Sequence, residues 1–134
     1  MNQITNTVKA SLLASILPES TDIYVALLTA LPTDYDGTGL AELDSTWYAR
    51  VAHDAWVNAT DDGVVSRKNN GAVVFAATDA AESGIIGWAI YDAATNGTLI
   101  ACGPIHDSDG EDASVDLAIG DVFQFQTQDL EVRL

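Results

Sequence analysis

Positive charge is scarce in this sequence. Five Lys and Arg residues stand against 20 Asp and Glu, giving a formal net charge of −15 over 134 residues. Direct nucleic-acid binding is excluded, because no basic patch can neutralise phosphates. The sequence favours adaptation to high salt, where a dense carboxylate surface stays hydrated and its self-repulsion is screened. Docking onto a basic partner and a generic soluble surface are the alternatives.

Cysteine and long apolar runs are also scarce. Cys102 is the only cysteine, so no intrachain disulfide can form, and its apolar neighbours predict a buried, inert thiol. No apolar run approaches the roughly 18 residues that span a bilayer, so we expect no membrane partner. Because Lys9 is the only positive charge near the start and no clear cleavage site follows, we interpret residues 1–17 as a folded element.

What is present indicates one β-rich domain over residues 1–134, with a helix or arm at 1–17 and a sandwich at 18–134. Thr5 or Asn6 can cap a helix that Pro18 ends. Its apolar residues recur every four positions, which predicts a face packed on a sheet, with an arm gripping a neighbouring subunit as the alternative. These residues are Ile4, Val8, Leu12 and Ile16, with Leu13 and Leu17 beside them.

The remaining chain reads as short strands separated by turns. Residues 84–105 predict a central hairpin, because Asn96-Gly97 tolerates positive φ and both faces of the strands are apolar. Further strands are expected at 22–30, 47–57, 64–68, 72–77, 114–119, 122–125 and 130–134, with a turn at 58–63 and long polar loops at 32–45 and 106–112. This spacing predicts a mainly β fold, an antiparallel β-sandwich of jelly-roll type.

Catalytic motifs are missing. His53 and His106 are the only histidines, and His53 cannot pair simply with Asp54, because adjacent strand residues point to opposite faces. No nucleophile elbow, zinc-protease motif or phosphate-binding loop occurs. We therefore predict a protein without enzymatic activity.

Two acidic loops are the candidates for metal binding. Asp34 and Asp36 flank one glycine turn, and Asp107 and Asp109 precede another, which places hard oxygen ligands at alternate positions. Neither loop completes a twelve-residue calcium pattern. Solvated loops are therefore the expected alternative, and no cofactor is predicted beyond this weak indication of Ca²⁺.

Several phrases, in order, resemble a family of small virion proteins of tailed phages. They are IYVALLTALP, STWYAR, NNGAVVF, GWAIYDAATNGTLIACGPI and AIGDVFQFQTQDLEVRL, and together they span residues 4–134. Members are often labelled tail fibre proteins but look more like capsid decoration proteins. The resemblance implies a β-sandwich subunit on the virion surface, on the head or the tail, without catalysis and assembled in the host cytoplasm. The acidity adds the hypothesis of a halophilic host.

The leading interpretation is a capsid decoration subunit that bridges copies of the major capsid protein as a homo-oligomer, with a trimer favoured. The alternative is a tail- or fibre-associated protein that contacts the host surface or its glycans, with Tyr35 as the exposed aromatic between two aspartates. Aromatic and arginine side chains carry most interface energy, although core packing is open for the two tryptophans. The predicted interface residues are Trp47, Tyr48, Arg50, Trp56, Tyr35, Leu12 and Ile16.

Overall fold

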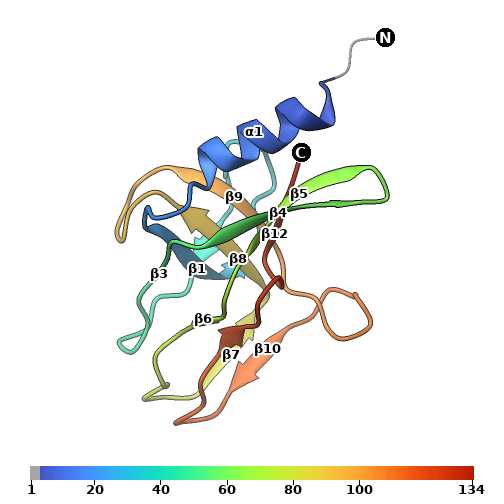
Figure 1. The fold of residues 1–134 in the computed structure, drawn as a ribbon. Coiled ribbons are helices and arrows are strands. Elements are labelled where there is room, and N and C mark those ends of the chain that lie inside the picture. The colour runs from blue at the N-terminus through green and yellow to red at the C-terminus, as the bar shows by residue number, and fades with distance from the viewer. Residues whose placement is uncertain (1–3) are drawn as a thin grey trace.

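The computed structural model describes residues 4–134, which form a mainly β protein with one short helix (Figure 1). Helix α1 (Asn6–Ile16) begins after Thr5, whose side chain accepts a hydrogen bond from the Val8 N–H. Among the described residues, no helix is long and apolar enough to cross a membrane. The strands are β1 (Ile23–Ala30), β2 (Ala41–Glu42), β3 (Val51–His53), β4 (Trp56–Asp61), β5 (Val64–Asn69), β6 (Val73–Val74), β7 (Glu82–Ile85), β8 (Gly87–Tyr91), β9 (Leu99–Pro104), β10 (Val115–Leu117), β11 (Gln124–Phe125) and β12 (Glu131–Arg133).

The predicted hairpin is the centre of the largest sheet. Strand β8 is buried along its whole length and lies between β1 and β9 in the order β2-β1-β8-β9, with β3 also paired to β1. The β8–β9 turn contains Asn96 at φ 55° and Gly97 at φ 78°. The left-handed conformation that an Asn-Gly turn favours is therefore present, and the prediction is confirmed.

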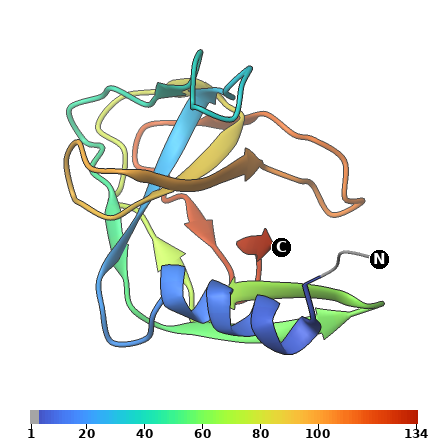
Figure 2. The same cartoon turned by 90° about the horizontal axis from the view of Figure 1, so that it is seen from above.

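A second sheet of three strands, in the order β12-β5-β4, faces the first across the core. Helix α1 lies along the β4–β5 hairpin (Figure 2). Two small sheets, β10-β7 and β11-β6, complete a sandwich-like arrangement in which every pair is antiparallel. The core includes Leu27, Trp56, Phe75, Ile85, Ile90 and Leu130. The mainly β, antiparallel class and the single short helix near the N-terminus are thus confirmed.

The predicted packing face of the helix is wrong. Leu13 and Leu17 are fully buried, whereas the residues that recur every four positions face solvent. Both sets of apolar residues repeat with a four-residue spacing, so periodicity alone does not choose between them; after the helix, Arg67 Nε of β5 donates to the Leu17 carbonyl oxygen at 2.6 Å. The exposed residues, 44–51% accessible, are Ile4, Val8, Leu12 and Ile16.

The predicted strand at 47–57 is also wrong, because the chain changes sheet within it. Residues 47–50 lie outside any strand, β3 pairs with β1, and β4 starts at Trp56 to pair with β5. The predicted turn at 58–63 shrinks to Asp62 and Gly63, at φ 48° and 79°. The alternation of apolar residues over 47–57 therefore continues through the point where the chain passes from one sheet to the other, and the local pattern does not reveal this change.

Candidate interaction surfaces

Arg50 lies at the centre of a cluster of polar side chains and contacts several groups at once. Its guanidinium forms a bidentate pair with Glu42, with Nε to Oε1 at 2.9 Å and Nη2 to Oε2 at 2.8 Å. Its Nη1 donates to the carbonyl oxygens of Ala93 at 2.9 Å and Asn96 at 2.7 Å. Its Cζ lies 3.7 Å from the centroid of the Tyr91 ring. One side chain thus holds β2 to the turn of the central hairpin.

Tyr48 completes this cluster. Its hydroxyl donates to Glu42 Oε1 at 2.6 Å and accepts from the Leu27 N–H at 3.1 Å. Burial, reinforced by the Glu42 hydrogen bond, raises the pKa of Tyr48 far above its ordinary value. Burial alone would raise the pKa of Glu42, but the hydrogen bonds from Arg50 and Tyr48 together lower it. Arg50 and Glu42 therefore stay charged as an ion pair, and the neutral Tyr48 hydroxyl donates to Glu42.

The residues of the STWYAR phrase act inside the fold. Trp47 is 9% exposed and Trp56 is fully buried, so both tryptophans pack in the core. Core packing, the option left open by the sequence, is the role that the structure shows for them. The Arg50 side chain is only 8% exposed and is occupied by its pairing with Glu42. The sequence analysis did not identify Glu42 as the ion-pair partner of Arg50. Arginine is rare in this chain, which has only five Lys and Arg residues, and that rarity is a signal to look for a carboxylate partner.

The exposed face of α1, formed by Val8, Leu12 and Ile16 and continued by Ile4 just before the helix, is a different kind of surface, and we refer to these four residues as the α1 stripe. It contains two of the predicted interface residues. None of the 20 acidic residues of the chain precedes Glu19, and the helix itself carries only Lys9 as a charge. An apolar stripe free of carboxylates therefore interrupts an otherwise acidic surface.

The acidic loops use their carboxylates within their own turns. Asp36 Oδ1 accepts from the Thr38 N–H at 2.8 Å, and hydrogen bonding from the Thr38 side chain, together with this backbone bond, lowers the pKa of Asp36. Asp107 Oδ1 accepts from the N–H groups of Asp109 and Glu111 at 2.9 and 3.0 Å. Within residues 4–134, no three His, Cys, Asp or Glu side chains come together as a metal site.

The remaining candidates are dispersed over the molecule. Tyr35 is fully exposed, and its N–H donates to Asp34 Oδ1 at 2.7 Å. The His53 ring packs edge-on against Trp56, with the centroids 5.2 Å apart. His106 pairs with Asp112 at 3.2 Å in the exposed loop after β9. The two histidines thus serve separate local contacts.

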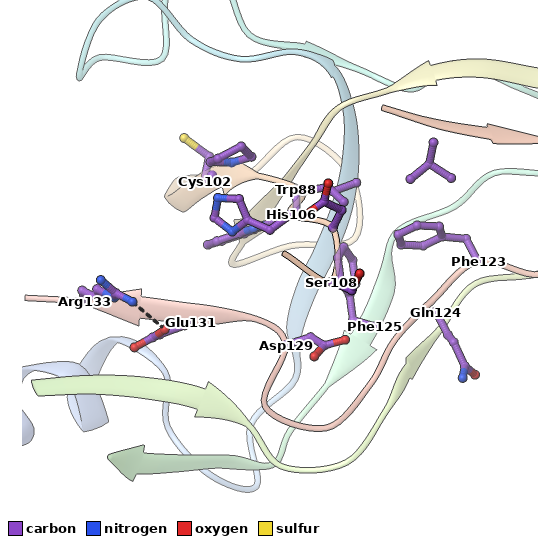
Figure 3. A pocket seen from close by; sticks show the side chains of 15 residues that line it. Trp88, Cys102, His106, Ser108, Phe123, Gln124, Phe125, Asp129, Glu131 and Arg133 are labelled. Carbon is purple, nitrogen blue, oxygen red and sulfur yellow. Dashed lines mark hydrogen bonds and ion pairs between the residues drawn. The ribbon is translucent and has the colours of Figure 1, made fainter. Parts of the chain in front are cut away.

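Two open grooves of about 750 and 740 Å³ lie between β9 and β12. The first is lined by aromatic side chains of the core and by polar residues of the loop after β9 (Figure 3). The second extends toward α1 and the loop that holds Tyr35. The surfaces available to partners are therefore the α1 stripe, these grooves and the acidic loops.

A family model described as Podophage GP4 fiber I protein gp80 matches residues 2–133. The chain belongs to this family. No curated protein matches the chain. Membership in the gp80 family confirms the resemblance to virion proteins of tailed phages, and it makes the chain a structural component of the phage virion.

Proposed function

We propose that this gp80-family chain is a non-enzymatic subunit of a phage fibre and that it assembles with further copies of itself through the α1 stripe. The word fibre in the description of the matching family supports the fibre assignment. The single observation that carries the assembly surface is the α1 stripe, where large aliphatic side chains are about half exposed.

Charge supports a second copy as the partner of this stripe. Two chains of net charge −15 repel each other over most of their surface. The region before Glu19 lacks carboxylates, so copies can approach there with the least repulsion and the largest apolar burial.

Oligomeric state tests this surface. Val8 and Val74 have equal exposure, 48%, but Val74 lies on β6. We expect the wild-type chain and Val74→Asp to be oligomers in light scattering after size-exclusion chromatography, and Val8→Asp to be monomeric. An aspartate in the first helical turn favours the helix, so loss of folding is not the expected cause. A monomeric wild type, or an oligomeric Val8→Asp, would contradict the proposal.

A capsid decoration subunit that bridges the major capsid protein is the second candidate. It is favoured by the short strands, of two to eight residues, which within residues 4–134 form a small sandwich and no elongated shaft. Decoration requires several hundred copies spread over the head, whereas a fibre requires a small number at the tail. Counting the chain in purified particles by quantitative mass spectrometry separates the two candidates.

A further inference from the structure

The two grooves between β9 and β12 form one continuous feature. They share Trp88, Cys102, Glu131 and Arg133 as lining residues, so one opens into the other. We refer to both together as the edge trench. Figure 3 shows its first half, with Trp88 and Cys102 on one side and Glu131 and Arg133 on the other.

The trench is bordered by strand edges and not by sheet faces. Residues 99–104 of β9 line it without a gap, and residues 131–134 do so in the second half, whereas in the first half β12 contributes Glu131 and Arg133. Because successive side chains of a strand point to opposite faces, a groove on one face would be lined by alternate residues. An unbroken run therefore means that the backbone edges of β9 and β12 face the trench. Both strands are the last in their sheets.

Hydrogen bonds on the far side of the sheet show which β9 groups are free. The Leu27 N–H donates to Tyr48 and its carbonyl accepts from the Leu43 N–H at 2.9 Å, so the Leu27 backbone points away from β8. Its partner Trp88 then directs its own backbone toward β9, to Gly103. The neighbouring residue, Cys102, must direct its N–H and C=O into the trench.

The backbone groups of β12 also alternate between its neighbour β5 and the trench. The Leu134 N–H donates to the Val65 carbonyl of β5 at 3.2 Å. Alternation along the strand then directs the backbone groups of Glu131 and Arg133 away from β5, toward the trench. Backbone donors and acceptors without a hydrogen-bond partner in residues 4–134 thus lie along both walls. Natural proteins usually protect such edges with charges, prolines or a covering segment, because they template pairing with another chain.

The charge in the trench indicates what chemistry would fill it. Among the described residues that line it, Arg133 is the only lysine or arginine and is paired with Glu131 at 3.2 Å, while His106 is paired with Asp112. The carboxylates of Asp34, Asp107 and Asp129 have no cationic partner in the described part of the chain. The apolar side chain between the walls is Trp88, which lines both halves. The trench therefore combines a strand edge with free backbone groups, an apolar surface at Trp88 and an excess of negative charge.

We propose that the edge trench binds an extended, lysine- or arginine-bearing polypeptide segment of a partner protein by strand addition to β9. The backbone of the segment pairs with Cys102, its apolar side chains cover Trp88, and its cations lie near Asp107 and Asp129. Backbone pairing supplies affinity and alternate side chains supply specificity in this mode of recognition. Ile16 belongs to both the α1 stripe and the lining of the trench, but pairing with β9 requires no contact with Val8, so each proposal can fail alone.

The test uses the intact chain and a labelled peptide of eight alternating Lys and Val residues. We expect the peptide to bind in fluorescence anisotropy and to protect Cys102, the only cysteine, from alkylation by N-ethylmaleimide. A peptide of equal charge with alternate backbone nitrogens methylated should bind at least about tenfold more weakly, since two or more ladder bonds are lost. The Glu-Val counterpart should not bind.

The matched variants test the location. Asp107→Asn with Asp129→Asn removes two charges while the amide oxygens can keep the turn hydrogen bonds to Asp109, Glu111 and Gln126. The control, Asp22→Asn with Asp44→Asn, removes the same charge outside the trench. We expect the first pair to weaken binding by about fivefold to tenfold and the control to change it little.

Three results would overturn the proposal. If the methylated peptide bound as tightly as the unmethylated one, charge attraction and not backbone pairing with β9 would explain the binding. An equal effect of the two variant pairs would place the peptide elsewhere. Protection of Cys102 at high protein concentration without any peptide, combined with no binding of the Lys-Val peptide, would mean that a second copy of this chain fills the trench.

Discussion

Replacement of Arg50 by alanine probes the contact that ties the central hairpin to the rest of the sheet. The side chain makes two hydrogen bonds to Glu42 and two to the carbonyls of Ala93 and Asn96, and it covers the Tyr91 ring. Its removal leaves a half-buried carboxylate and two carbonyl oxygens without their donor.

The size of the loss follows from burial. Breaking a buried ion pair by removing one partner costs about 3–5 kcal/mol. Because Arg50 is 8% exposed but Glu42 is 25% exposed, we expect the lower end of that range. A loss of about 3 kcal/mol lowers the melting temperature of a domain of this size by about 10 °C. Arg50→Lys keeps the charge but loses the bidentate geometry, so an intermediate loss is expected.

Urea unfolding followed by tryptophan fluorescence measures these differences. A double-mutant cycle with Glu42→Gln isolates the pair, and we expect a coupling energy of about 1–3 kcal/mol. If Arg50→Ala changed the free energy of unfolding by less than about 0.5 kcal/mol, the size of an ordinary surface substitution, the reasoning would be refuted.

The stability that the Glu42 carboxylate contributes depends on pH. The pKa of Glu42 is lower in the folded chain than in the unfolded one, so the folded state favours the carboxylate. The stability it contributes is fully present above the unfolded value of about 4.3 and is lost as pH falls through the folded value. The stability difference between wild type and Glu42→Gln should therefore be constant near neutral pH and shrink below about pH 4.

Three further predictions concern the core and the surface. Trp56→Ala should cost about 3–5 kcal/mol in urea unfolding, because the side chain is fully buried, whereas Trp56→Phe should cost clearly less, since Nε1 has no hydrogen-bond partner among the described residues. Asn69→Ala should cost about 2–4 kcal/mol, because its amide bonds the carbonyls of Gly71 and Gln126 and accepts from the Leu130 N–H. Raising KCl from 0.1 M to about 2 M should raise the melting temperature, since the net charge of −15 is then screened; an unchanged melting temperature would remove the high-salt hypothesis.

Local chemistry made part of the fold predictable. Thr5 and Pro18 delimit the helix because capping and the missing proline N–H act on their own segment. Asn96 and Gly97 mark the hairpin because they tolerate the positive φ that the turn needs. The side of the helix that is buried was not predictable, since Leu13 and Leu17 repeat with the same spacing as the exposed stripe and the strands that cover one side, β4 and β5, are distant in the sequence.

The surfaces depend on sheet order, which no local pattern encodes. The Arg50 cluster joins a carboxylate eight residues away to carbonyls 43 and 46 residues away. The edge trench exists because β9 and β12 are the end strands of different sheets. A sequence shows that Cys102 and Glu131 are strand residues, but not that their backbones face one groove.

We have proposed that this gp80-family chain is a fibre subunit. The measurement that tests it most directly is the location of the chain in a reconstruction of the intact phage particle, where the sandwich with its single short helix can be fitted into the density. We predict the chain in the fibre, with α1 against a neighbouring copy. Density for the chain spread over the head, or its absence from the particle, would contradict the account.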